Sequence, residues 1–249
     1  MRKTFVHGVG GVVSADIAVP EHPSEVEFYS TVLTTGDAPL WRDDLMNNRG
    51  TPVIGLGERI PEYESLPLQW MPHIQVADVA ASAAAAIELG GRELMHGKDQ
   101  DGHSLWAGLI DPDGAAFGII PAVPSDSVPG ESDEAGPIGC ISWLSLWVPD
   151  AQSSRNFYQR VVGWESAGDD GRRYEMGIGS ETKVAEICQS EAGKAMPAVW
   201  LIHLPVDDLR QSVLLVESEG GEVIQDSSDT AIVRDPIGVH FAIQSKPKN

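Results

Sequence analysis

The sequence is poor in cysteine and in positive charge. Its 249 residues include two cysteines, Cys140 and Cys188, and 17 lysines and arginines against 37 aspartates and glutamates. Two distant cysteines form neither a disulfide framework nor a spaced metal cluster, so we interpret them as thiols in a reducing cytosol. The net charge of −20 would repel nucleic acids and anionic membranes. We therefore expect no nucleic-acid partner and no membrane partner.

Long hydrophobic runs and several familiar motifs are also missing. No segment approaches the ~20 apolar residues of a membrane span, and the N-terminal segment MRKTFVHGVGG lacks the apolar run of a signal peptide. The sequence contains no G-x-S-x-G elbow and no P-loop, and the glycines at 8–11 precede a strand instead of following one. We expect a cytoplasmic protein that is neither a serine hydrolase of that type nor a dinucleotide-binding enzyme.

What the sequence does contain is an internal duplication. The segment ISWLSLWVPDAQSSRNFYQRVVGW, residues 141–164, alternates like a strand up to Val148 and then takes the i, i+4 spacing of a helix. Its Val-Pro-Asp at 148–150 lies 129 residues after Val-Pro-Glu at 19–21, and its Phe-Tyr at 157–158 lies 129 residues after Phe-Tyr at 28–29. A second related pair of segments begins at Leu68 and at Pro197. The sequence therefore predicts four units, each a strand, a helix and three further strands.

The expected elements follow from periodicity and from turn residues. We predict helices over 22–33, with Ser24 as N-cap and Val26, Tyr29 and Leu33 on the buried side, over 80–89, from Ser153 onward, and over 209–219. Asp-Pro-x-Gly at 111–114 and 235–238 and Asn-Asn-Arg-Gly at 47–50 predict turns. The proline-rich acidic stretch at 122–137 predicts a linker between an N-terminal domain at 8–121 and a C-terminal domain at 138–245.

The Val-Pro-Asp strand end, the Asn-Phe-Tyr helix, the later Asp-Pro-x-Gly turn and the doubling of this unit resemble the vicinal oxygen chelate superfamily. That superfamily includes glyoxalases, dioxygenases and bleomycin-resistance proteins, and the chain looks most like its bacterial tandem glyoxalase-like members. The resemblance implies an α+β fold of two glyoxalase-like domains. Each domain would pair two βαβββ units into a curved, incompletely closed barrel. It does not fix the chemistry, because the superfamily hosts many reactions.

The resemblance also implies where a divalent metal would bind. The first-strand ligand positions fall on Ser14, Met71, Trp143 and Leu201, and the last-strand positions on Gly55, Gly118, Glu186 and Ala242. Catalytic metals need several oxygen or nitrogen ligands converging on one point. Because Glu186 is the one carboxylate at these positions, we predict no family metal site and no cofactor. A divalent metal in a shifted site is the alternative.

Histidines and acids supply the candidate chemistry. His203, His240 and Glu186 could form a shifted metal or acid/base site in the second domain, and the alternative is that each histidine is satisfied by backbone or water. Asp16, if buried, would be the acid/base candidate of the first domain, although a structural carboxylate is an equally good interpretation. The catalytic candidates are therefore Asp16, Glu186, His203 and His240.

An aromatic strand face predicts a pocket for a small molecule. Trp143, Ser145 and Trp147 share one face of a strand, and we expect Trp106 and Trp200 to line the same curved sheets. The alternative is that these rings only fill a core. The ligand-binding candidates are Ser14, Asp16, Met71, His73, Gln75, Trp143, Ser145, Trp147, Glu186, Leu201, His203, His240 and Gln244.

Three functions fit these observations. The first is a glyoxalase-like protein without the family metal site that binds a small organic, partly aromatic molecule in one or both clefts. The second is a metal-dependent lyase, isomerase or dioxygenase with a shifted site, and the third is a metal-free hydroxylase or lyase. The sequence leaves the oligomeric state open between monomer and homodimer.

Overall fold

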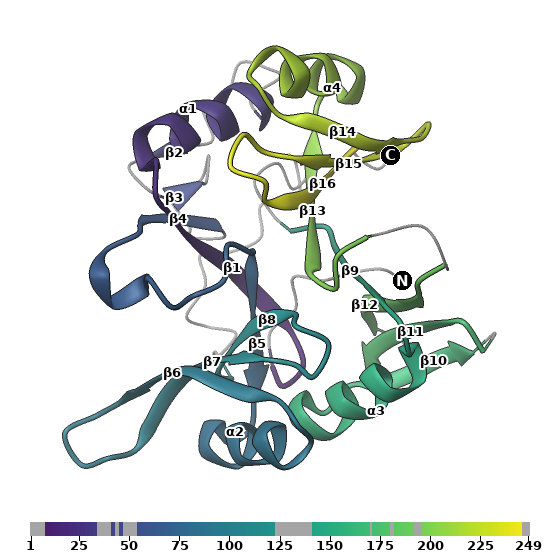
Figure 1. Cartoon of the computed structure of the whole chain (residues 1–249). Helices are drawn as coiled ribbons and strands as arrows, with labels where there is room; N and C mark the ends of the chain where they lie inside the picture. Colours follow the sequence, from purple (N-terminus) through teal and green to yellow (C-terminus); the bar gives the residue numbers. More distant parts are fainter. Residues whose placement is uncertain are drawn as a thin grey trace. The chain divides into compact units, whose positions relative to one another are not determined.

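The computed structural model describes residues 8–33, 41–42, 45–46, 54–122, 141–169, 171–179, 182–191 and 196–245 (Figure 1). Within them, a strand, a helix and three strands follow one another four times, which confirms the four predicted βαβββ modules. In the described part of the chain, no helix has the length and apolar character to cross a membrane. The modules run β1(Val12–Val19), α1(His22–Leu33), β2(Trp41–Arg42), β3(Leu45–Met46), β4(Ile54–Glu58); β5(Met71–Val76), α2(Val79–Glu88), β6(Arg92–Lys98), β7(Ser104–Ile110), β8(Ala116–Pro121); β9(Trp143–Val148), α3(Ala151–Val162), β10(Glu165–Asp169), β11(Arg173–Ile178), β12(Thr182–Gln189); and β13(Trp200–Val206), α4(Leu209–Ser218), β14(Glu222–Asp226), β15(Thr230–Arg234), β16(His240–Ser245).

Helix α3 shows how the sequence sets an element. The side chain of Asp150 accepts a hydrogen bond from the backbone N–H of Ser153 and so caps the first turn. Phe157 and Val161, one turn apart, are buried on one stripe. Gly163 ends the helix with φ 76°, a left-handed conformation that glycine adopts without strain.

Each module closes with the same strand pairing. Its first and last strands run parallel, and the other pairs of neighbours are antiparallel. Strands β1 to β8 make one eight-stranded sheet and β9 to β16 another. Both sheets are mixed and neither is a closed barrel, so the predicted α+β glyoxalase-like fold is confirmed.

The chain divides into two compact units that do not follow sequence order. Unit 1 contains the second and third modules together with residues 8–13 and Trp200, and unit 2 contains the rest of the first and fourth modules. In unit 1, α2 packs against α3, and in unit 2, α1 packs against α4 (Figure 1). Each unit therefore combines a module from each half of the sequence. The domain boundaries at 8–121 and 138–245 stay a prediction.

A tyrosine clamp joins the two modules of each unit. In unit 1, the hydroxyl of Tyr158 donates to Asp111 Oδ2 at 2.9 Å and accepts from Trp200 Nε1 at 2.8 Å. In unit 2, Tyr29 donates to Asp235 Oδ2 at 2.8 Å and accepts from Trp70 Nε1 at 3.1 Å. The Phe-Tyr pair and the Asp-Pro-x-Gly turn recur in the sequence because they are the two sides of this clamp.

Two local predictions are wrong, and two lie mostly or wholly outside the described residues. Helix α1 already begins at His22, so Ser24 lies inside its first turn and does not cap it. Val26 is half-buried, while Tyr29 and Leu33 point into the core. The predicted turn at 47–50 and nearly all of the predicted linker at 122–137 fall outside the described residues.

Candidate functional site

One face of the third module gathers the predicted aromatic and acidic residues. Glu186 on β12 pairs in register with Ser145 on β9, and Cys188 pairs with Trp147. Residues paired in register project from the same face of a sheet, and every second residue along a strand shares that face. Trp143, Ser145, Trp147, Glu186 and Cys188 therefore lie on one surface, which we call the β9–β12 face.

The third strand of this surface adds charge. On β11, Arg173 pairs in register with Cys188 and Glu175 pairs with Glu186. Between them, Tyr174 projects to the other face, where Arg155 of α3 stacks over its ring at 5.0 Å. The β9–β12 face is thus the side of the sheet that α3 does not cover.

Burial and ion pairing define the chemistry of the face. Trp143 and Ser145 are each 2% exposed and Glu186 is 8% exposed, whereas Arg173 is exposed. Arg173 forms an ion pair with Glu186, and Lys183 forms one with Glu175. Burial lowers the pKa of Arg173, but the charge of Glu186 and its hydrogen bond, together with smaller contributions from Cys188 and Glu175, raise the pKa above its ordinary value. The face therefore presents two indole rings beside a permanent cation held by a carboxylate.

The indole N–H of Trp147 is a buried donor without an acceptor on the described part of this face. Its indole Nε1 is buried, and no hydrogen-bond acceptor reaches it among the residues that the structure describes. A buried N–H without an acceptor costs about 1–3 kcal/mol. A ligand oxygen bound here would recover that energy.

In the second module, the candidate residues Gln75 and His73 make packing contacts and backbone contacts. Gln75 is fully buried, and its backbone pairs with Gly10 and Gly11 while its Oε1 accepts from the N–H of Gly8 at 3.2 Å. The ring of His73 occupies the space that a side chain at position 118 would need. Gln75 thus anchors the segment before β1, and His73 packs over Gly118. Met71, at the start of β5, is half-buried.

In unit 2, candidate residues lie on the fourth module. His203 on β13 pairs in register with Ala242 on β16, so His240 and Gln244, each two residues from Ala242, share its face. His203 is 8% exposed and Leu201 is fully buried, while His240 and Gln244 are half-buried. Burial, and then the charge of Arg234, lower the pKa of His240. His203 and His240 belong to unit 2 and Glu186 to unit 1, so their predicted cluster stays a prediction.

Two further expectations concern exposure. In the first module Asp16 is exposed on β1 and Ser14 is half-buried, so the burial that made Asp16 an acid/base candidate is not found. Trp200 is fully buried and bonds to Tyr158 of α3, and Trp106 is 42% exposed. Trp200 therefore faces α3, and the ring of Trp106 lies over Gly97 of β6. Neither indole forms an aromatic wall with Trp143 and Trp147.

The positions that the resemblance assigns to metal ligands do not fit a cation. Trp143 and Leu201 are buried and apolar, Met71 offers a thioether, and the space beside Gly118 is filled by a histidine ring. Glu186 is already engaged by a guanidinium. A single paired carboxylate supplies too few ligands to hold a divalent metal.

An exposed cluster on the β6–β7 hairpin has a composition suited to a metal. The ligand atoms of Asp99, Asp101 and His103 lie within 4.8 Å of one another. Asp99 Oδ1 already accepts from the backbone N–H groups of Asp101 at 2.9 Å and His103 at 2.8 Å. The hydrogen bond from the His103 backbone is the largest cause of the lowered pKa of Asp99. Because the turn accounts for these contacts, the cluster defines no metal centre by itself.

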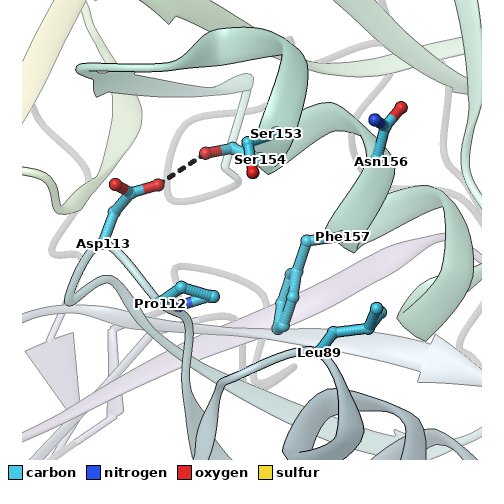
Figure 2. A pocket seen from close by; sticks show the side chains of 7 residues that line it. All are labelled: Leu89, Pro112, Asp113, Ser153, Ser154, Asn156 and Phe157. Atoms are coloured by element: carbon cyan, nitrogen blue, oxygen red, sulfur yellow. Dashed lines mark hydrogen bonds between the residues drawn. The ribbon is translucent and has the colours of Figure 1, made fainter.

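A small hollow lies elsewhere in unit 1, between helices α2 and α3 and the β7–β8 turn. Its volume is about 140 Å³, below the ~300 Å³ at which ligand pockets usually begin. Figure 2 shows the hydroxyl of Ser154 directed at the carboxylate of Asp113, with which it forms a 2.7 Å hydrogen bond. The other lining residues are Leu89, Pro112, Ser153, Asn156 and Phe157. This hollow is a packing feature of the module contact.

Sequence reasoning missed three residues of the face. Arg173, Glu175 and Cys188 are not among the ligand-binding candidates that the sequence supplies. Their alternation on β11 and β12 was a usable signal. The sequence gives no signal for which strands pair, and that pairing is what brings these residues beside Trp147 and Glu186.

Comparison with known proteins identifies the family to which this chain belongs. The family model of the glyoxalase-like domain matches residues 13–120 and 143–244, so the chain belongs to the glyoxalase-like domain family. The chain is 28% identical over 130 residues to the anthracycline biosynthesis protein DnrV of Streptomyces peucetius, a match covering 43% of this chain and 47% of that protein. A 27% identical match with the same coverage is DauV of Streptomyces sp. strain C5. The match thus spans about half the length of these curated relatives.

Solved structures share the fold at low sequence identity. The Mn(II)-bound glyoxalase from Novosphingobium aromaticivorans aligns with a TM-score of 0.57 at 15% identity, covering 96% of this chain and 83% of that one. A homoprotocatechuate 2,3-dioxygenase variant from B. fuscum in complex with HPCA aligns with a TM-score of 0.57 at 12% identity, covering 99% and 73%. These likenesses show the fold alone.

Proposed function

We propose that this protein binds a small, partly aromatic organic molecule on the β9–β12 face without the family metal. The observation that carries the proposal is the combination on this face of two indole rings, a buried acceptorless Trp147 N–H and the Arg173–Glu186 ion pair. Indoles supply flat apolar contact, and the few polar groups fix orientation. Among the family positions for metal ligands, Trp143, Leu201 and Ala242 are apolar and Glu186 is the one carboxylate.

The polar groups indicate which ligand chemistry fits. The Trp147 N–H is a donor, and the exposed guanidinium of Arg173 offers further donors, while Ser145 can donate or accept. A ring bearing a carbonyl, phenol or carboxylate oxygen would place an acceptor at the Trp147 N–H, beside the guanidinium of Arg173. The names of the two relatives, anthracycline biosynthesis proteins, support an oxygenated aromatic ligand class.

The first test is a binding titration. A thermal-shift panel of phenols, catechols, aromatic acids and anthraquinones identifies a ligand, and isothermal calorimetry gives its Kd for wild type, Trp147→Phe and Trp106→Phe. Removing the Trp147 N–H is expected to weaken binding about tenfold, because about 1.4 kcal/mol is lost. Trp106→Phe is the matched control on an exposed indole of the same unit and leaves Kd unchanged. Equal Kd values in all three proteins, or no ligand in the panel, would contradict the proposal.

The second test concerns metal. The proposal expects protein purified without chelator to contain far less than one Fe, Mn, Zn or Ni per chain by mass spectrometry. One tightly held ion per chain would instead favour the metal-dependent lyase, isomerase or dioxygenase that the structural neighbours suggest. His203→Ala and Asp99→Ala would then distinguish the fourth-module histidines from the exposed hairpin cluster. A metal-free hydroxylase or lyase predicts turnover of the bound ligand that Glu186→Gln abolishes.

A further inference from the structure

Unit 2 contains two carboxyl groups in contact inside its core. Glu25 of α1 is 1% exposed and Asp235, in the turn before β16, is 3% exposed. Besides burial, the charge and the proximity of Asp235 raise the pKa of Glu25, so the two side chains are neighbours. Asp235 accepts from the backbone N–H of Val239 at 2.7 Å and from the hydroxyl of Tyr29 at 2.8 Å, and Tyr29 lies one turn after Glu25 on α1. One oxygen of Glu25, Oε2, is buried and has no hydrogen-bond partner among the described residues.

Two carboxylates have only acceptors, so neighbouring buried carboxyl groups form a hydrogen bond to each other when one of them holds a proton. Burial raises the pKa of Asp235 too, but the hydrogen bonds from Val239 and Tyr29 oppose this rise and favour its ionised form. Among the described residues no donor reaches Oε2 of Glu25, so Glu25 is the group that carries the proton. A second negative charge buried beside the first would be strongly unfavourable.

Unit 1 offers an internal comparison. Ser154 stands 129 residues after Glu25, in the same place on its helix, and Asp111 stands where Asp235 stands in the turn. Ser154 donates to the exposed Asp113 instead of facing a second buried carboxyl. The tyrosine clamp is thus the same in both units, but the carboxyl pair occurs in unit 2.

We propose that Glu25 and Asp235 share one proton at neutral pH and that its loss loosens the contact between α1 and the turn before β16. The device acts on unit 2, whereas the β9–β12 face belongs to unit 1. At pH values above about 6, the corresponding contact in unit 1 keeps its structure.

The direction of the pH effect follows from the pKa of Glu25. Burial, and then the charge of Asp235, raise the pKa of Glu25 from 4.5 to about 8. Of the titratable groups that interact with it in the described residues, Asp235 lies on the turn and Tyr29 on the same helix, and the pKa of Tyr29 is raised well above 10, so it stays neutral. The folded state therefore binds more protons than the unfolded state between pH 4.5 and 8. Stability falls as pH rises through this window and levels off above it.

The test is hydrogen exchange measured by mass spectrometry at pH 6.5 and pH 7.5, corrected for intrinsic rates, on the full chain. In wild type, the opening constant of peptides from α1 and residues 235–239 is expected to rise up to about tenfold per pH unit. Peptides from α3 and residues 111–115 change little, because the pKa of Asp111, raised by burial, is about 6. Glu25→Gln keeps a neutral donor toward Asp235 and removes the pH dependence of the α1 peptides.

Parallel loss of protection in wild type and Glu25→Gln would overturn the proposal. Glu25→Ser, which copies the arrangement of unit 1, gives the same test if the glutamine variant does not fold. Infrared spectroscopy of wild type supplies a readout that needs no variant, since a protonated buried carboxyl has a distinct C=O stretch. The band is expected at pH 7 and disappears as pH rises through about 8. Its absence at pH 7 would also overturn the proposal.

Discussion

Replacing Trp164 with alanine is expected to lower the free energy of unfolding by about 3–5 kcal/mol, the range for deleting a large buried aromatic ring. Trp164 is 1% exposed in unit 1. Its ring stacks on Tyr158 at a centroid distance of 5.6 Å and meets Trp200 edge-to-face at 5.8 Å. Its Nε1 donates to the backbone oxygen of Gly10 at 2.7 Å. The substitution therefore leaves a cavity and an unpaired carbonyl, which urea denaturation monitored by circular dichroism would measure.

The matched control is Trp106→Ala in the same unit. This indole is 42% exposed and rests over Gly97, so its removal leaves no enclosed cavity. It is expected to change the free energy of unfolding by no more than about 1 kcal/mol. If the two variants lost equal stability, Trp164 would not hold the segment at 8–11 to the core as the structure shows.

Tyr158→Phe is expected to lower the free energy of unfolding by about 2–4 kcal/mol, although it removes a single oxygen. That oxygen donates to Asp111 and accepts from Trp200, and both partners are buried. Burial raises the pKa of Tyr158 well above 10, so its hydroxyl stays protonated and keeps donating. Hydrogen bonds to charged groups are worth about 1.5–3 kcal/mol, and a stranded indole N–H adds to the loss. Equilibrium urea unfolding supplies the measurement.

Tyr174→Phe is the control for this substitution. Tyr174 is also buried in unit 1, but its contact in the described structure is the stacking of Arg155 on its ring, which phenylalanine preserves. A double-mutant cycle with Asp111→Asn would then isolate the clamp itself. A coupling energy near zero would mean that Tyr158 stabilises unit 1 by ring packing, through its contacts with Phe117 and Trp200, and not by its hydroxyl.

The sequence by itself determined the modules. Strand alternation at 143–148, the helical stripe containing Phe157 and Val161, and the Asp-Pro-x-Gly turns are local patterns set by backbone geometry and by nearby burial. Such patterns predicted the four βαβββ units and the family. They also predict that the metal positions implied by the resemblance lack a full set of ligands, since that needs only residue identity and register.

The tertiary structure decided which modules meet and what their side chains do there. Tyr158 bonds to a turn 47 residues away and Tyr29 to one 206 residues away, and no periodicity carries that information. In the sequence Glu25 is an acid in the first turn of a helix, and only the tertiary packing places it near Asp235. Arg173 likewise became part of a candidate site because strand pairing set it beside Glu186. Burial, pKa and ligand chemistry depend on these distant contacts, which local sequence does not specify.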